Sequence, residues 1–510
     1  MDLFNGGQIP LSNVPILAVE EFRNQILESC HGSARLVNLF GMVQAPAGAG
    51  QANGPVRLFA ILGQDEEAGL EILSTLIDPQ SGQFESLTKD LPQAHLFERE
   101  IAEQWAIMPV GHPWLKPLRY HSNYRSAPDI WKNIADKTIP GEYPFYAVAG
   151  EEVHEVGVGP VHAGIIEPGH FRFQCHGEAI MHLEIQLGYQ HRGIEPLMAA
   201  GDLKRSMLLS ESIAGDTSIG HSTAFCEVME SLTGTVVSSR AQAIRAVALE
   251  LERLANHIGD LGALGMDAGF LPTSAYFGRM RGDYLNLLLS LTGNRFGKGL
   301  CRPGGVLFDI DAQMADDFCL KLKKYREEFQ DVADLLFTRP SVLARFEGVG
   351  IIGLKDAKEI GLVGPAGRAS QLECDVRMNF PSGMWQYHHV PISLGATGDV
   401  YARALVRRQE VTRSLEFLLR VLPSLPTGEI FVSPGPMKPD TLAVSLVEGW
   451  RGEIMHVGIS NAQGGLARYK IKDPSFHNWF GVALSMRGGE ISDFPLCNKS
   501  FNLSYSGHDL

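Results

Sequence analysis

The sequence predicts an α+β protein in which a small α+β domain precedes a mainly α-helical domain with small antiparallel β-sheets. Long segments with apolar residues at helical spacing fill the middle of the chain, and short β-like runs lie towards both ends. A segment interspersed with proline and charged residues separates two regions of different character. We therefore predict domains at 1–125 and 157–510, joined by a linker at 126–156.

The predicted N-terminal domain alternates helical and extended runs, beginning with residues 13–42. An Ala- and Gly-rich stretch at 45–55 predicts a loop, and the apolar run 56–63 predicts a strand. In the segment 95–107, apolar residues at helical spacing stand beside acidic ones. That pattern is typical of an amphipathic helix.

The predicted second domain opens with strand-like runs at 171–177 and 181–187. Residues 241–264 place apolar side chains on one stripe, as a helix buried in a bundle requires. Similar helices are expected at 275–292, 312–337 and 400–423, with loop or strand insertions at 302–306 and 368–377. The runs EIFVS, EIMHVGIS and LARYKIKD (429–433, 453–460 and 466–473) predict further short strands.

Composition excludes several functional classes. The net charge of −14 and the absence of a Lys/Arg cluster argue against a nucleic-acid surface. No apolar run approaches the roughly 18–20 residues of a membrane span, and no signal peptide is visible. The seven cysteines form no C-x-x-C pair, which favours reduced thiols and argues against an iron–sulfur cluster held by this chain.

The stretch from Gly159 to His221 is the densest candidate site. It contains the runs GPVHAGIIEPGHFRF and GYQHRGIEPL, several histidines and a Gly/Ser-containing turn. A redox metal site at this turn would need a Cys-x-x-Cys pair, but the chain has Ala214-Gly-Asp-Thr217. The histidines follow neither H-x-x-x-H on a helix nor H-E-x-x-H.

Nine motifs in collinear order carry a family resemblance: GPVHAGIIEPGHFRF, HRGIEPL, LERLANHIGDLGAL, LTGNRFG, RPGGV, GRASQLECDVR, GDVYARALVRRQEV, RYKIKDPSF and DFPLCNKSFNLSYSGHDL. Together they resemble the large subunit of group 4, energy-converting nickel–iron hydrogenases and the related 49-kDa subunit of respiratory complex I. The earlier HLFEREIAEQWAI resembles the 30-kDa subunit of complex I, here fused in front. The similarity is strong over 90–510 and weak over 1–90.

In that family two C-x-x-C pairs hold nickel and iron. The resemblance places them at Ala214 and Thr217 and at Ser504 and Gly507, so all four thiolates are absent. Hydroxyls are too basic to replace bridging thiolates, and Ala and Gly have no ligating atom. We expect no nickel–iron centre and no other cofactor held firmly by this chain.

The shell around those positions keeps residue types that the resemblance connects with chemistry. Glu167 matches a proton-relaying glutamate, and a buried carboxyl suits that task. Arg451 matches an arginine that points at the hydrogenase metal, and His170 is the best counterpart of a quinone-contacting histidine. The alternative for Glu167 is a structural carboxylate, for Arg451 a buried ion pair, and for His170 a structural loop histidine.

The resemblance also implies a cavity at which His162, Gly215, Thr217 and Ser504 would bind substrate. Complex I has a quinone-contacting tyrosine near Gly215, and no tyrosine occurs between 190 and 275, so a complex-I-type quinone site is not implied in full. Small side chains here would leave space that charged neighbours keep wet.

Two further sets are expected to be structural or metal-binding. Arg368, Asp375 and Arg377 alternate charge in apolar surroundings, which favours a buried ion network over chemistry. Glu195 matches a magnesium ligand near the hydrogenase C-terminus, but Leu510 stands where the family has a terminal histidine, with His508 two residues away.

The leading hypothesis is an electron-transfer subunit of a membrane-associated oxidoreductase complex that reduces a quinone or another small acceptor, coupled to ion translocation. The alternative is a non-catalytic scaffold between an iron–sulfur subunit and an ion-pumping membrane arm. Both imply a hetero-oligomer with a small subunit that holds a [4Fe-4S] cluster and with antiporter-like membrane subunits. Both also imply a peripheral position on the cytoplasmic face of the membrane.

Overall fold

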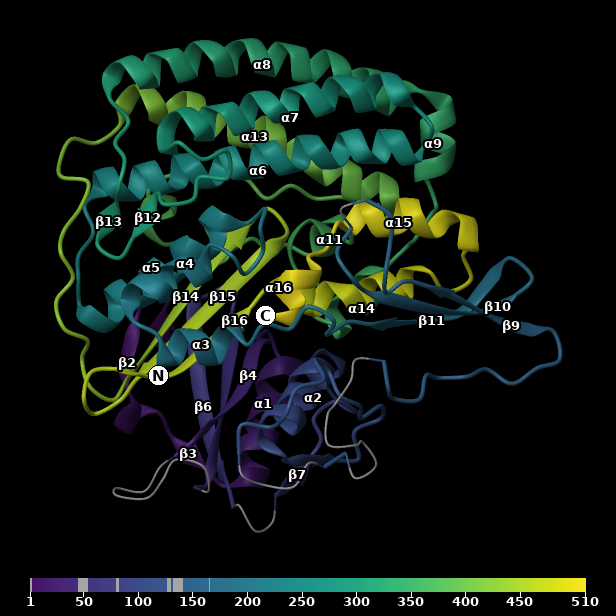
Figure 1. The fold of residues 1–510 in the computed structure, drawn as a ribbon, viewed down its shortest axis with the longest axis vertical. Coiled ribbons are helices and arrows are strands. Elements are labelled where there is room, and N and C mark those ends of the chain that lie inside the picture. The colour runs from purple at the N-terminus through teal and green to yellow at the C-terminus, as the bar shows by residue number, and fades with distance from the viewer. Residues whose placement is uncertain (1, 45–53, 79–81, 126–129, 132–140, 165) are drawn as a thin grey trace.

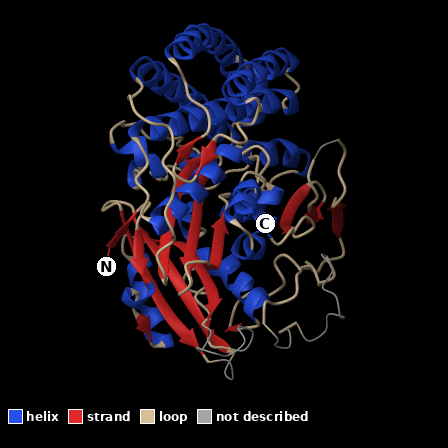
Figure 2. Cartoon of the chain, turned by 60° about the vertical axis from the view of Figure 1, so that its left-hand side comes forward, coloured by secondary structure: helices blue, strands red, loops and turns tan. Residues whose placement is uncertain are grey.

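The computed structural model of the protein describes residues 2–44, 54–78, 82–125, 130–131, 141–164 and 166–510. Helices and sheets are both abundant, which confirms the α+β class. The long helices form a layer above two packed sheets (Figures 1 and 2). The loop predicted at 45–55 and the linker predicted at 126–156 fall largely or partly outside the described residues.

The N-terminal sheet has the order β1-β6-β5-β4, with β3 parallel to β6. Its strands are β1 (Asp2–Phe4), β3 (Ile16–Leu17), β4 (Arg35–Val43), β5 (Val56–Gln64) and β6 (Gly69–Ile77). Helices α1 (Val19–His31) and α2 (His95–Trp105) pack against it. Nearby are the parallel pair β7 (Gln83–Glu85) and β8 (Met108–Val110) and the short turns η1 (Leu11–Asn13) and η3 (Pro92–Ala94).

Strand β5 shows why this sheet is buried on both faces. Side chains alternate between the faces of a strand. Leu58 and Leu62 join the core formed with α1 and α2, whereas Phe59 and Ile61 join a second core with the C-terminal sheet. A continuous apolar run is the expected result of burial on both sides.

The C-terminal sheet has the order β16-β15-β14-β2 and is antiparallel throughout. It contains β14 (Thr441–Gly449), β15 (Gly452–Ser460), β16 (Leu466–Lys472) and the N-terminal β2 (Gln8–Pro10). Two of the three strands predicted in this region are present. The run 429–433 is not a strand and makes only an isolated bridge, from Phe431 to Gly305, so that prediction was wrong.

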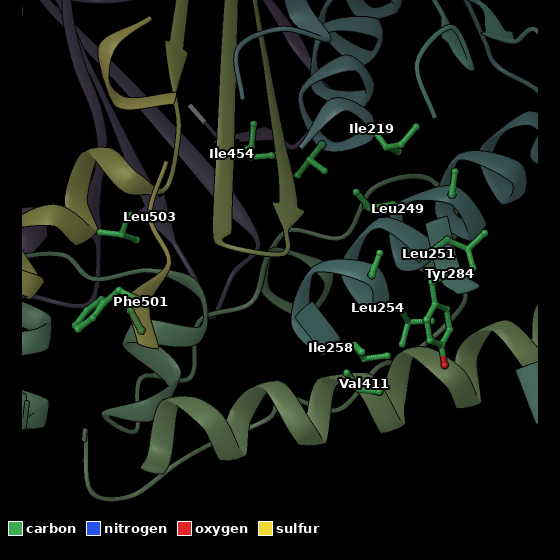
Figure 3. Close-up of a cluster of buried hydrophobic side chains, with 14 of the residues drawn as sticks. Ile219, Leu249, Leu251, Leu254, Ile258, Tyr284, Val411, Ile454, Phe501 and Leu503 are labelled. Atoms are coloured by element: carbon green, nitrogen blue, oxygen red, sulfur yellow. The ribbon is translucent and has the colours of Figure 1, made fainter. Parts of the chain in front are cut away.

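The helical layer consists of α5 (Ser218–Thr233), α6 (Ser239–Asp267), α7 (Leu271–Thr292), α8 (Ala312–Thr338) and α13 (Val400–Val421). The predicted stripe on α6 is buried, with Leu251, Leu254 and Ile258 inaccessible. These side chains pack with Val411 of α13 in the core close-up (Figure 3).

Shorter helices connect the layers: α3 (Ile194–Ala200), α4 (Leu203–Ser210), α9 (Pro340–Phe346), α10 (Leu354–Glu359), α11 (Gly364–Ala369) and α12 (Val376–Asn379), with the 3₁₀ helices η4 (Gly383–Gln386) and η5 (Leu422–Ser424).

A separate three-stranded antiparallel sheet comprises β9 (Val153–Val158), β10 (His170–His176) and β11 (Ala179–Gln186). The RPGGV segment forms the hairpin β12 (Cys301–Arg302) and β13 (Gly305–Val306). The tail folds into α14 (Ser475–Ser485), η6 (Ile491–Asp493), α15 (Phe494–Phe501) and α16 (Tyr505–Asp509). Helix α16 lies near the centre of the molecule, beside the C-terminal sheet (Figure 1).

Candidate functional site

A cavity of about 690 Å³ lies between the turn before α5, the loop after β9 and the chain tail. Five of the residues expected around a pocket line it: His162, Glu167, Gly215, Arg451 and Ser504. These residues come from four separate segments, which the fold brings together. One wall is apolar and is formed mainly by Phe171, Phe173, Phe494 and Leu503.

Arg451 is buried and forms an ion pair with Asp216, whose side chain is 34% exposed. Its Nη1 and Nη2 atoms donate to the two carboxylate oxygens at 2.6 and 2.8 Å, its Nε donates to Asn502 O at 2.6 Å, and the guanidinium stacks on Trp450. Burial alone would raise the pKa of Asp216, but the charge and hydrogen bonds of Arg451 hold this pKa below its usual value. The guanidinium therefore has its counter-charge within the chain.

The four positions that correspond to thiolates hold no sulfur. Ala214 is a buried methyl group, and Thr217 Oγ1 accepts hydrogen bonds from Trp450 Nε1 at 3.1 Å and Arg451 Nη1 at 3.2 Å. Ser504 Oγ caps α16 by accepting from Gly507 N at 2.8 Å. The two hydroxyls are thus used to hold the local structure.

Gly507 also lacks the space for a ligating side chain. A Cβ atom built there would lie 2.6 Å from Cγ of Asp473, closer than such atoms approach. The buried carboxylate of Asp473 therefore occupies the volume that a cysteine at 507 would need. The residues present do not fit a nickel–iron centre, both in donor type and in space.

Asp473 begins a buried row of hydrogen-bonding side chains that the sequence did not reveal. Its Oδ2 lies 3.0 Å from His221 Nε2, His221 Nδ1 lies 3.1 Å from His456 Nε2, and His456 Nδ1 lies 2.8 Å from the Tyr469 hydroxyl. All four side chains are buried. Burial lowers the pKa of His456 and raises that of Tyr469, so both are neutral at physiological pH.

Glu167 is half-buried at the cavity wall, where Gln190 Nε2 donates to its Oε1 at 3.1 Å and Ser506 N approaches Oε2 at 3.4 Å. His162 Nε2 lies 2.8 Å from Gly169 O and so ties the loop together. His170, expected to contact a substrate, does not line the cavity. It lies on β10, where Nδ1 is 3.0 Å from Gly159 O and the ring packs on Phe145.

Glu195 lies among cations of its own chain. Lys470 Nζ and Ile471 N donate to its Oε1 at 2.9 and 3.0 Å, and Arg468 Nη2 donates to Oε2 at 2.8 Å. These cations, together with Arg119, outweigh burial and lower the pKa of Glu195. Both oxygens of Glu195 are thus already paired with cations of the chain, so the geometry favours an ion pair over a magnesium ligand.

Arg368, Asp375 and Arg377 lie in one buried ion network. Arg368 pairs with Glu410 at 2.7 Å and with Glu448 at 2.8 Å, and its Nη1 is 3.5 Å from Asp375. Arg377 pairs with Asp375 at 2.7 Å. The charges of these residues are paired within the chain, and none of them lines the cavity beside Arg451, so the geometry indicates a structural role.

The described residues offer neither a preformed metal cluster nor a membrane span. Within them, no group of three or more His, Cys, Asp or Glu side chains is arranged to hold a metal ion. Among the helices that the structure describes, none is both long and apolar enough to cross a bilayer.

The model of the 49-kDa subunit family of respiratory-chain NADH dehydrogenase matches residues 267–439. The carbon monoxide-induced hydrogenase of Rhodospirillum rubrum is 32% identical over 350 residues, which are 68% of this chain and 97% of the relative. The chain belongs to the family of group 4 hydrogenase large subunits and complex I 49-kDa subunits.

Other members of this family are similar over more of the chain. Formate hydrogenlyase subunit 5 of Escherichia coli is 31% identical over 456 residues, which are 85% of this chain and 78% of the relative. A fused subunit of the NADH-quinone oxidoreductase of Bacteroides thetaiotaomicron is 27% identical over 412 residues, 75% and 77% of the two chains. These matches confirm the family that the motifs indicated.

Proposed function

We propose that this chain is the large subunit of a membrane-associated oxidoreductase complex and works without a nickel–iron centre. The observation that carries the proposal is the carboxylate of Asp473, which fills the space beside Gly507 where a ligating thiolate would stand. The substitutions at Ala214, Thr217 and Ser504 agree with it. A cavity remains beside these positions, lined in part by residues that can handle protons.

The proposed role of the cavity is to bind a quinone or another small electron acceptor. Its aromatic wall suits an apolar ring, and Glu167 at the polar side could supply protons as electrons arrive. A two-electron acceptor would take two electrons, one at a time, from a [4Fe-4S] cluster of a partner subunit. Two protons would balance the charge, and Glu167 would be reprotonated from solvent.

The proposed partners are a small iron–sulfur subunit and membrane subunits that include antiporter-like ones, with the chain peripheral on the cytoplasmic face. In this assembly acceptor reduction would be coupled to ion translocation. Support comes from relatives such as the membrane-bound hydrogenase subunit alpha of Pyrococcus furiosus, which is 29% identical over 364 residues, 68% of this chain and 85% of the relative.

A second candidate is a non-catalytic scaffold that joins the iron–sulfur subunit to an ion-pumping arm. The ion pair between Arg451 and Asp216 favours it, because the buried cation in the cavity wall is already neutralised within the chain. The hydroxyls of Thr217 and Ser504 are likewise used within the chain.

Turnover measurements on the purified complex separate the two candidates. If the cavity is catalytic, reduced complex is oxidised by a water-soluble quinone analogue, and Glu167→Gln slows turnover roughly 100-fold because a general acid is lost. Glu178→Gln, which changes an exposed carboxylate in the turn between β10 and β11, is the matched control and leaves turnover unchanged. His170→Ala also has little effect, because that side chain lies outside the cavity. A folded complex with no turnover would support the scaffold instead.

A further inference from the structure

A second cavity of about 670 Å³ shares no lining residue with the first and has no part in the proposed function. It is formed where α2 and the following loop 112–118 face β11 and α14. Figure 1 shows α2 on the lower side of this junction and α14 with β11 above it. The cavity thus lies between the N-terminal domain and the rest of the chain.

Arg99 is a buried cation that faces this cavity. Its Nε donates to Lys116 O at 3.0 Å and its Nη2 to Pro117 O at 2.8 Å, and only 8% of the residue is exposed. In the described part of the chain no carboxylate forms an ion pair with it. A buried guanidinium with only carbonyl partners is costly, and burial accordingly lowers the pKa of Arg99.

Other cations surround the same space and leave it with excess positive charge. Lys89 and Arg487 are exposed at the rim and make no ion pair among the described residues. Glu184 is the one carboxylate in the described lining, and it is already paired with Lys116. Glu184 also accepts from Trp114 Nε1 at 3.3 Å and from Tyr146 N at 2.7 Å. Three cations are therefore left without a carboxylate partner among the described residues, in a chain of net charge −14.

The remaining walls are largely apolar, with Leu96, Leu118, Leu187, Trp479 and Phe480 among them. A simple inorganic anion would satisfy the cations but leave these walls uncovered. A neutral apolar molecule would cover the walls and leave Arg99 without a counter-charge. Only a ligand that combines both properties satisfies the whole cavity.

We propose that this cavity binds an organic anion in which a phosphate or carboxylate group is attached to an apolar body. The anionic group would lie against Arg99, with Lys89 and Arg487 at the entrance. A soluble metabolite and an anionic lipid share this chemistry. The number of alkyl chains on the ligand that binds more tightly distinguishes the two sources.

Calorimetric titration of the purified complex with octyl phosphate tests the proposal. Octyl phosphate is expected to bind at one site per chain, at least about tenfold more tightly than either octanol or inorganic phosphate. Tighter binding of dioctanoyl phosphatidate would indicate a lipid source, and tighter binding of octyl phosphate a soluble one. Octanol or inorganic phosphate binding as tightly as octyl phosphate would overturn the proposal.

Substitutions locate the site. Arg99→Gln is expected to weaken octyl phosphate binding at least about tenfold, whereas Arg99→Lys keeps the charge and weakens it less than about threefold. Ala483→Trp, which fills the cavity, should abolish binding, and the exposed Lys204→Gln is the matched control that changes nothing.

A rim variant covers the case in which Arg99→Gln fails to fold. Lys89→Gln combined with Arg487→Gln changes only exposed side chains, so folding should be preserved. It is expected to weaken binding severalfold and to reduce its dependence on salt. Unchanged affinity in this variant, or in folded Arg99→Gln, would overturn the proposal.

Discussion

Gly507 has no side chain, and the carboxylate of Asp473 lies only 2.6 Å from the position that a Cβ would take. The position is therefore coupled to a residue 34 positions earlier in the chain. This contact shows that the cysteine at 507 is not simply replaced by a smaller residue. A larger side chain would fit at 507 only if Asp473 moved.

Gly507→Ala tests this coupling. The added methyl group is expected to destabilise the protein by about 1–3 kcal/mol through overpacking, even though alanine favours a helix. Gly215→Ala is the matched control, because nothing lies within 4 Å of its added Cβ, and it should be neutral or stabilising by up to about 1 kcal/mol. Urea denaturation gives both values, and equal stability of the two variants would contradict the coupling.

Glu227 predicts a pH dependence of stability. It is half-buried on α5 and accepts from Ser382 Oγ at 3.2 Å and Ser445 Oγ at 2.6 Å, and loss of solvation raises its pKa to about 7. Its contribution to stability is fully present below its ordinary pKa, about 4.3. That contribution is lost as pH rises through 7, because the folded state then holds a poorly solvated negative charge.

Glu227→Gln should therefore flatten the stability profile between pH 5 and pH 8, with a relative gain on the order of 2 kcal/mol at the upper end. Denaturant titrations across this range measure the effect. The exposed Glu429→Gln is the control and should retain the slope of the unsubstituted protein. A Glu227→Gln profile as steep as that of the control would refute the assignment.

Residue types around the cavity could be predicted in part. Glu167, His162 and Arg451 were expected there and line it, because motifs in collinear order identify their segments. His170 shares the same loop, but the strand β10 begins at this residue and carries its side chain away. Asp473 and His456 were missed because their contacts join segments more than 230 residues apart, and no local pattern reports such a contact.

At the scale of elements, α6 and α13 are joined by buried charges as well as by apolar packing. Glu250 of α6 and Glu410 of α13 both pair with arginines from the segment 368–377. That segment has little regular structure of its own, so the charges determine where it lies. Buried pairs of this kind contribute little when complete and cost much when one partner is removed.

Arg368→Ala should destabilise the protein by about 3–5 kcal/mol, because Glu448 would lose its ion pair with Arg368 and Glu410 would keep only Arg253 and His257. The matched control is Lys321→Ala, which removes an exposed pair with Asp317 on α8 and should cost less than about 0.5 kcal/mol. Thermal and chemical denaturation measure both. A loss for Arg368→Ala no larger than that for Lys321→Ala would contradict the network.

Elements with strong periodicity were predicted well and others were not. The stripe on α6 repeats over many turns, so its helix follows from the sequence. Strand β14 is buried along its whole length and shows no alternation, and it was missed. The tail helices are short, and their positions depend on tertiary contacts such as the Ser504 cap, which periodicity cannot show.

At the scale of the whole molecule, the two sheets share one core. Phe59 and Ile61 of the N-terminal sheet pack with Leu442, Val444 and Val457 of the C-terminal sheet. Strand β2 pairs directly with β14, and Asn5 Nδ2 donates to Leu446 O at 2.8 Å. Domains predicted from composition at 1–125 and 157–510 are thus connected through a continuous apolar layer.

This shared core predicts a single unfolding transition for the intact chain. Differential scanning calorimetry should show one peak with equal calorimetric and van't Hoff enthalpies. Ile61→Ala leaves a cavity between the sheets. It should lower the free energy of unfolding by roughly 2–4 kcal/mol and shift the single peak to lower temperature. Two separate peaks, with only one of them moved by the substitution, would show that the sheets unfold independently.

We propose that the pocket between residues 214–217 and 504–507 does not hold a nickel–iron centre. Nickel analysis of the purified complex by mass spectrometry tests it most directly, after growth in nickel-supplemented medium. The structure predicts a nickel content far below one per chain, unchanged in Asp473→Ala. One nickel per chain, lost in variants of the cavity residues, would contradict the claim.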